Sequence, residues 1–484
     1  MGHGKARRPI GSDLGGVSAL WDRLSQAGRR VAVINVPVTY PPRPVNGVVI
    51  SGMLTPSEDT DYTYPPELRG QLQAAVGAYR ANPYAAITQS KAFLKEASYW
   101  VEQRERANQW LLQQEPWDCF ISVIQAPDPI QHYFWTFLQT THVDYHAPGA
   151  AAFRALVLEV FQRIDAVIAR RLAVLDERTV LLLMSDHGAG EATHWFHLNR
   201  WLLEQGLLAL KDRAAKRWLR WGGLDQGWVL NTLRHLDMLN LRGRMNNLVR
   251  QGWRERMDQL MASAVDWSRT RAYAGSPSAE AIYINLVGRE AEGIVQPGIE
   301  YEQLRAAIKE RLLALRGPDG EPVVEAVHYR ESIYHGPHLN QAPDLVLEIG
   351  HRPYLISENL SARHLFERIP FRAARGRHRP EGILLAYGPA VGAPGMRSPA
   401  RIEDLTPTIL HLLGLLVPSE LDGRVLVDWL DPAWAAGVAY TEPAATAMPL
   451  VPSVGLSSEP QATDYSAEDI AAIEERLRSL GYLD

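Results

Sequence analysis

Two short segments of the sequence place a carboxylate close to an imidazole. Asp128 and His132 are four residues apart in APDPIQHYFW, and Asp186 and His187 are neighbours in MSDHGAG. Residues i and i+4 share one face of a helix, so Asp128 and His132 can meet one cation. An adjacent Asp and His at the end of a buried segment need a partner or a metal. Each segment alone also fits ordinary structure, namely a helix N-cap at Asp128 and an Asp-rich turn at Asp186.

A third candidate, His378, lies in the Gly/Arg-rich segment GRHRPEGILLAYGPA and by itself would be a surface histidine. Together Asp128, His132, Asp186, His187 and His378 offer oxygen and nitrogen atoms without sulfur, which suits Zn²⁺ or Mn²⁺ rather than a structural zinc site. Five ligands exceed one tetrahedral site with an open position. The set therefore predicts two divalent ions, with Zn²⁺ preferred to Mn²⁺, and such paired ions act on phosphoryl groups.

Four further histidines form two H-x-x-H pairs, His194 with His197 and His335 with His338. This spacing also occurs in metal sites. Neither pair has a carboxylate directly beside it, so loop structure or contact with substrate is favoured over metal binding.

Short apolar, β-branched runs are the elements that must position these groups, and we interpret them as buried strands. Amphipathic helical segments lie between them, at Trp21–Gln26 and Ala152–Leu175 among others. Alternating strands and helices predict an α/β fold with a mainly parallel sheet, in which ligands gather at the carboxyl ends of the strands. The runs are Val31–Val36, Cys119–Ile124, Val180–Met184, Ala281–Leu286, Asp344–Ile349 and Gly382–Tyr387.

The expected organisation is a core over residues 1–430, a Pro/Ala/Ser-rich linker over 431–465 and a C-terminal helix within 466–484. Ser466 and Asp469 form a capping-box pattern before that helix. Within the core, 200–270 is expected to be a helical insertion, and between Lys211 and Arg256 it carries 11 Lys/Arg against 4 Asp/Glu. Either this is a solvated basic helix face, or it attracts an anionic substrate, lipid or nucleic acid. Contact with a membrane surface is a further alternative, because this segment contains Trp218, Trp221, Trp228 and Trp253.

Composition excludes several classes of protein. The 484 residues are 46% hydrophobic and 22% charged, with a net charge of -5, so a specific nucleic-acid reader is not expected. No run of about 18 apolar residues and no N-terminal apolar signal occurs, which predicts a soluble chain, provisionally cytoplasmic. The one cysteine, Cys119, excludes an internal disulfide framework, a cysteine zinc finger and an iron–sulfur cluster.

Five segments, in order along the chain, resemble the alkaline phosphatase superfamily, in its type I phosphodiesterase/nucleotide pyrophosphatase branch. They are ALWDRLSQAGRRVAVINVPVTYPP, APDPIQHYFW, MSDHGAG, GRHRPEGILLAYGP and EDLTPTILHLLGLLVPSELDGRVL. The resemblance implies a three-layer α/β/α sandwich with a mainly parallel sheet and a helical insertion.

The resemblance also implies particular roles for the candidate residues. Asp128, His132 and His378 would bind one ion, and Asp186 and His187 the other. Tyr40, in the Pro-rich loop, would stack on a base or sugar, with loop packing as the alternative. The reaction implied is hydrolysis of phosphodiester or pyrophosphate bonds in small phosphate-ester or nucleotide-like substrates. Sulfatases share this fold, but Cys119 lies inside a predicted strand and does not match their nucleophile.

One departure from the family pattern concerns the nucleophile. In the family, a strand ending in a metal-binding Asp and a helix beginning with a Thr or Ser nucleophile precede the Trp-led segment, which here begins by Trp21. Thr39 and Thr55 lie downstream and do not match, so we expect neither group in this sequence. A misassigned start or a fragment, a truncated gene, and a degenerate member that binds an anionic ligand without hydrolysing it remain as explanations. In each case the 484 residues alone would not hydrolyse through that nucleophile.

Overall fold

A computed structural model of the chain describes residues 12, 18–82, 90–211, 264–275, 280–336, 338–360, 362–369, 376–440 and 465–479. The chain divides into two compact units. In the described part of the chain, unit 2 takes in the residues from 12 to 189 and from 380 to 479, and unit 1 takes in those from 190 to 379. The chain therefore passes from one unit to the other at two points, after Ala189 and after Arg379.

The central sheet of unit 2 is built around β1 (Val31–Ile34), whose four residues are all buried. Strands β2 (Gly47–Ile50) and β4 (Cys119–Ser122) pair with β1 in parallel on its two sides, and β3 (Thr63–Tyr64) adds to β2 antiparallel. The order is β3-β2-β1-β4. The carboxyl ends of β1, β2 and β4 therefore open onto the same edge of the sheet.

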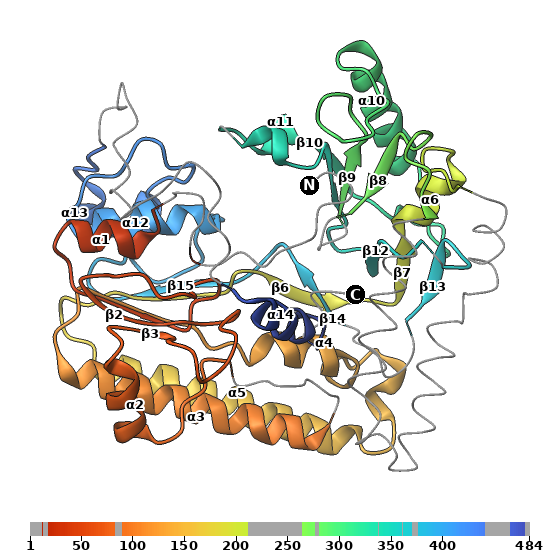
Figure 1. Ribbon diagram of the computed structural model, residues 1–484. Coiled ribbons are helices and arrows are strands. Elements are labelled where there is room, and N and C mark those ends of the chain that lie inside the picture. The colour runs from red at the N-terminus through yellow and green to blue at the C-terminus, as the bar shows by residue number, and fades with distance from the viewer. Residues whose placement is uncertain are drawn as a thin grey trace. The chain divides into compact units, whose positions relative to one another are not determined.

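Helices cover both faces of this sheet (Figure 1). Because side chains alternate along a strand, β1 contributes to two separate cores. Ala32 and Ile34 pack with apolar side chains of α2 (Leu68–Val76) and α3 (Lys91–Gln114). Val31 and Val33 pack with Leu24 of α1 (Leu20–Gln26) and Leu410 of α12 (Leu405–Leu412). Unit 2 thus has the three layers, α/β/α, that the sequence predicts.

Each of the six predicted runs contains a strand, usually shorter than the run. The predicted run at Val31–Val36 ends as a strand at Ile34, because Asn35 has a φ of 58° and turns the chain away. The predicted helices are also present, as α1 and as α5 (Ala150–Leu172). The remaining predicted runs correspond to β5 (Leu181–Met184), β9 (Ala281–Ile284), β11 (Leu345–Glu348) and β15 (Leu384–Tyr387).

Pairing in the described residues is mixed. The strands around β1 are parallel, whereas β5 and β15 form an antiparallel pair in which Leu384 lies opposite Met184. A second two-stranded pair joins β6 (Gly188–Glu191) to β14 (Gly376–Arg379). The chain passes from unit 2 to unit 1 within β6, which follows β5. It returns to unit 2 after β14, and β15 follows.

Unit 1 contains a four-stranded antiparallel sheet of order β10-β11-β9-β8. Leu304 and Ile308 of α10 (Ile299–Leu313) join its core. A three-stranded sheet, β12-β7-β13, lies in the same unit. The bounds are β7 (His194–His197), β8 (Ala272–Ala274), β10 (Ala326–Tyr329), β12 (Tyr354–Ser357), β13 (Phe366–Arg368), α6 (Leu198–Glu204) and α11 (Arg330–Ile333).

The C-terminal helix α14 (Ala467–Ser479) belongs to unit 2. Its predicted capping box is confirmed, because the Asp469 backbone N–H donates to Ser466 Oγ at 3.1 Å and the Ser466 N–H donates to Asp469 Oδ2 at 2.9 Å. Ile473 is buried against Leu54, in the loop after β2. The remaining elements are α4 (Pro127–Leu138), α13 (Pro432–Ala435) and short 3₁₀ turns at Val143–His146, Leu339–Gln341, Ile402–Asp404 and Val427–Trp429.

Parts of the expected organisation fall on residues that are not described. Most of the predicted insertion, 212–263, and most of the predicted linker, 441–464, lie outside the described residues. The division into core, linker and C-terminal helix stays a prediction. Among the described helices, none combines the length and apolar character needed to cross a membrane.

Candidate metal centre

Asp128 lies at the start of α4, shortly after the carboxyl end of β4. Pro127 begins the helix, where its missing N–H costs no helical hydrogen bond, and the carboxylate of Asp128 stands in the first turn, where negative charge is favourable. One turn later, His132 places its Nε2 atom 3.2 Å from Asp128 Oδ1. The two side chains therefore lie side by side on one face of the helix and are largely buried, and their binding to one cation stays a prediction.

His187 lies between β5 and β6. Its Nδ1 atom is 3.0 Å from the carbonyl oxygen of Gly188. A carbonyl only accepts hydrogen bonds, so Nδ1 carries the proton in this contact and Nε2 of the neutral ring keeps a lone pair. That Nε2 atom lies 3.9 Å from Asp128 Oδ1 and 3.6 Å from Asp186 Oδ1. Asp186 is the most exposed of these groups, with 74% of its side chain accessible.

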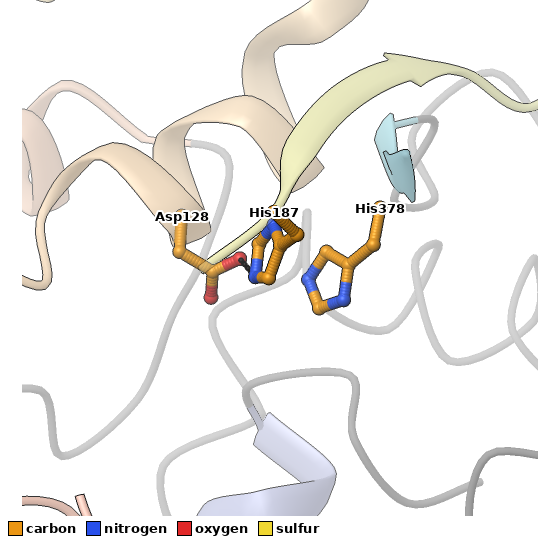
Figure 2. Close-up of side chains that lie close together, drawn as sticks. All are labelled: Asp128, His187 and His378. Atoms are coloured by element: carbon orange, nitrogen blue, oxygen red, sulfur yellow. Dashed lines mark ion pairs between the residues drawn. The ribbon is translucent and has the colours of Figure 1, made fainter. Parts of the chain in front are cut away.

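Asp128, His187 and His378 form a group that could hold a metal ion. Each offers one ligand atom, and these three atoms lie within 4.8 Å of one another. Figure 2 shows the carboxylate of Asp128 and the rings of His187 and His378 converging, with the Asp128–His187 contact dashed. One carboxylate oxygen and two imidazole nitrogens are suitable ligands for zinc, and three protein ligands leave a fourth position for water or substrate. The residues therefore fit a divalent cation.

The grouping of ligands differs in detail from the pattern that the resemblance implies. His187 lies with Asp128 and His378, whereas it was expected to share a separate ion with Asp186. His132 and Asp186 each contact one member of the group, Asp128 and His187 respectively. The five predicted residues thus include a close group of three and two adjoining side chains, and their assignment to one or two ions stays a prediction.

The H-x-x-H histidines have other contacts. His194 Nδ1 is 2.9 Å from the hydroxyl of Thr193, and burial, followed by the charge of Arg368, lowers the pKa of His194. His197 is buried, with Nε2 3.5 Å from Glu367 Oε2. Among the described residues, neither these two nor His335 and His338 belong to a cluster of three metal-ligating side chains.

Tyr40 is in contact with the C-terminal segment of the chain. Its ring centroid lies 5.6 Å from that of Tyr465, and its carbonyl oxygen accepts hydrogen bonds from Ser12 N and Tyr465 Oη. These contacts are those of loop packing, the alternative considered for this residue. A stacking role on substrate stays a prediction.

Thr39 and Thr55, whose positions do not match the family nucleophile, use their hydroxyl groups in local hydrogen bonds to the main chain. Thr39 Oγ1 donates to the Val36 carbonyl at 2.6 Å, and Thr55 Oγ1 donates to the Gly52 carbonyl at 2.7 Å. Both residues are buried. Cys119 lies within β4, where burial and then the charge of Asp118 raise the pKa of its thiol to about 11. A thiol with so high a pKa is a poor nucleophile at neutral pH.

A family comparison identifies the chain more closely. The model of the family described as type I phosphodiesterase / nucleotide pyrophosphatase matches residues 4–376. The chain belongs to this family. Comparisons with curated proteins and with solved structures give no match. The matched range includes Asp128, His132, Asp186 and His187 and ends two residues before His378.

Family membership supports phosphoester hydrolysis as the kind of reaction and small phosphoesters as the kind of substrate. The family is usually metal-dependent, in agreement with the group of Asp128, His187 and His378. No role was predicted for Ser185, which directly follows β5, or for Gly382, which lies two residues before β15. Both residues are part of the motifs that carried the resemblance, in MSDHGAG and in GRHRPEGILLAYGP, and that position was the available signal.

Proposed function

We propose that this protein hydrolyses phosphodiester or pyrophosphate bonds with the help of divalent metal ions, Zn²⁺ in preference to Mn²⁺. Asp128, His187 and His378 would hold one ion, and His132 and Asp186 would contribute to the same ion or to a second. The observation that carries the proposal is the convergence of these three ligand atoms within 4.8 Å in a chain of the phosphodiesterase family.

The chain's own residues have defined tasks in this proposal. The Gly188 carbonyl fixes the proton of His187 on Nδ1, which directs the lone pair of Nε2 toward Asp128. His132 Nε2, at 3.2 Å, holds one carboxylate oxygen of Asp128 in place. When bound, a divalent cation at such a site polarises phosphoryl oxygens. Side chains that hold ligands in orientation in this way commonly change metal affinity about 10- to 100-fold when they are removed.

Metal binding is the property that tests this site first, because it depends directly on the three ligand side chains and needs no nucleophile. The full chain is stripped of metal with a chelator and titrated with Zn²⁺ by calorimetry. We expect saturable binding, and loss of affinity by at least about 100-fold in His187→Ala and in His378→Ala. His338→Ala serves as the matched control, since His338 is exposed and its Nδ1 lies 3.3 Å from the side-chain nitrogen of the exposed Gln341. Equal binding by wild type and His187→Ala would contradict the proposal.

Hydrolysis is tested separately with bis(p-nitrophenyl) phosphate and a form of the protein that is shown to hold a Thr or Ser nucleophile. We expect release of p-nitrophenolate that chelator abolishes and that His378→Ala removes. Metal binding without hydrolysis in that form would favour the non-catalytic alternative, in which the site binds an anionic ligand only.

A further inference from the structure

The antiparallel pair of β5 and β15 ends in an unusual rung. Leu384 lies opposite Met184 in the regular ladder. At the next position the Ser185 N–H donates to the Ile383 carbonyl at 3.0 Å, as an antiparallel rung requires. The return bond is different, because the Ile383 N–H donates to Ser185 Oγ at 2.9 Å. A side-chain oxygen thus takes the place that a main-chain carbonyl normally fills.

Because the Ser185 hydroxyl accepts this hydrogen bond in place of the Ser185 carbonyl, the main chain after Ser185 is not held to β15 by a ladder bond. A regular rung would hold the Ser185 carbonyl against β15 and continue the strand, with side chains alternating between the two faces of the sheet. Here the hydroxyl closes the rung, so the backbone can turn at Asp186 and His187 before β6 begins at Gly188. The position of His187 therefore depends on the ladder ending at Ser185, two residues before it.

Gly382 allows the opposite strand to approach this turn closely. A Cβ atom added there would lie 2.5 Å from Ser185 Oγ, 2.9 Å from the Ser185 carbonyl oxygen and 3.4 Å from the main-chain carbon of His187. The backbone of Gly382 does not have a positive φ, so the requirement for glycine here is one of space. Any side chain would push the Ser185–His187 segment away from the strand that bonds it.

We propose that Ser185 and Gly382 are positioning residues that set the place of His187 as a metal ligand. Ser185 ends the ladder with its hydroxyl, and Gly382 makes room for that hydroxyl and for the turn that follows. The inference rests on the proposed function, in which His187 binds a metal. Both residues and His187 belong to unit 2.

The first test compares metal affinity with stability. In Ser185→Ala the Ile383 N–H loses its acceptor, but Ile383 is 58% exposed, so water can replace the hydroxyl. We expect the melting temperature of the metal-free chain to stay close to that of wild type, while Zn²⁺ affinity measured by calorimetry falls about tenfold. Ser185→Thr keeps the hydroxyl and should restore affinity to within about threefold of wild type. Ser332→Ala, which removes an exposed serine hydroxyl that donates to the Tyr329 carbonyl, is the control and should bind like wild type.

The second test uses Gly382→Ala and a readout that needs no metal. Hydrogen exchange of the metal-free chain is followed by mass spectrometry in peptides covering residues 185–188. We expect faster exchange there in Gly382→Ala and Ser185→Ala, and no change in Gly70→Ala, because a Cβ at Gly70 would meet no atom within 4 Å.

These measurements separate the possible failures. Unchanged exchange and unchanged Zn²⁺ affinity in Ser185→Ala would overturn the positioning role. A fall in affinity matched by an equal fall in Ser332→Ala, or a failure of Ser185→Thr to restore it, would also overturn it. If wild type itself binds no Zn²⁺ while exchange at 185–188 still rises in the variants, the proposed function fails, although the contact between Ser185 and Gly382 still shapes the turn.

Discussion

The Oδ1 atom of Asp128 lies 3.9 Å from Nε2 of His187, although the two residues follow different strands of unit 2. The same oxygen is 3.2 Å from Nε2 of His132. One carboxylate therefore joins the helix after β4 to the turn after β5, and both His132 and His187 contact it.

Asp128→Asn should weaken metal binding as strongly as His187→Ala or His378→Ala. The amide removes the negative charge but keeps the shape, so folding should be little affected. We expect Zn²⁺ affinity to fall at least about 100-fold in a calorimetric titration of the full chain. Asp176→Asn, at an exposed carboxylate in a turn, is the control. Binding by Asp128→Asn within a few-fold of wild type would exclude Asp128 as a ligand.

Asp344→Asn should destabilise unit 1 strongly. Asp344 is fully buried, accepts two hydrogen bonds from Arg289 at 2.8 and 2.6 Å, and accepts another from the Ile284 N–H at 2.6 Å. Removing one partner of a buried ion pair leaves the other charge uncompensated and costs about 3–5 kcal/mol. Urea unfolding followed by circular dichroism measures the loss. Glu204→Gln, in an exposed pair with Arg200, should change stability by less than about 1 kcal/mol. Similar effects for both variants would contradict this account.

Glu367 gives unit 1 a pH-dependent contribution to stability. The His197 ring, whose Nε2 lies 3.5 Å from Oε2, is the main cause that lowers the pKa of Glu367, and hydrogen bonds from the N–H groups of His364 and Arg363 lower it further. A carboxyl whose folded pKa lies below its unfolded value stabilises the protein above the unfolded pKa, and this contribution is lost as pH falls through the folded pKa. Glu367→Gln should therefore melt at a lower temperature than wild type at pH 7, with the difference disappearing in acid below about pH 4. A difference that is constant across this range would refute the assignment.

Cys119 should react slowly with alkylating reagents. Its pKa of about 11 leaves far less thiolate at pH 8 than an ordinary cysteine has, so we expect iodoacetamide labelling on the order of 100-fold slower than for a small free thiol. The rate should rise as the pH approaches 11. Labelling at the rate of a free thiol at pH 8, followed by mass spectrometry on folded protein, would contradict the burial of this side chain.

Ile473→Asp should detach the C-terminal helix. Ile473 is 1% exposed and packs in a small cluster with Leu54 and Tyr465, beside the loops that follow β1 and β2. Placing a charge there should release α14, since an unpaired buried charge is unfavourable. Faster hydrogen exchange over residues 467–479 checks this, with Glu468→Gln at an exposed position as the control. Unchanged protection in Ile473→Asp would show that this contact does not hold the helix.

The sequence predicted the strands and the helix that carry Asp128 and His187 because their apolar runs are local patterns. Apolar pattern alone did not reveal that β5 and β15 pair antiparallel, since pairing direction depends on the path of the chain between them. Residue type and position at strand ends predicted that Asp128, His187 and His378 belong to one metal centre. The close grouping of His187 with Asp128 and His378 was not predicted, because no local spacing encodes contacts between distant segments. The hydrogen bond of Ser185 was not predicted for a related reason. Its hydroxyl accepts the Ile383 N–H in place of a main-chain carbonyl, and a sequence pattern does not show which atom accepts that bond.

The central claim is that Asp128, His187 and His378 bind one divalent ion. The most direct measurement is a crystal structure of the full chain soaked with Zn²⁺, with anomalous diffraction recorded on both sides of the zinc absorption edge. The account predicts an anomalous peak within about 2.0–2.2 Å of a carboxylate oxygen of Asp128 and of one ring nitrogen each of His187 and His378. A peak only at another histidine pair, such as His194 and His197, or no peak near Asp128, would contradict it.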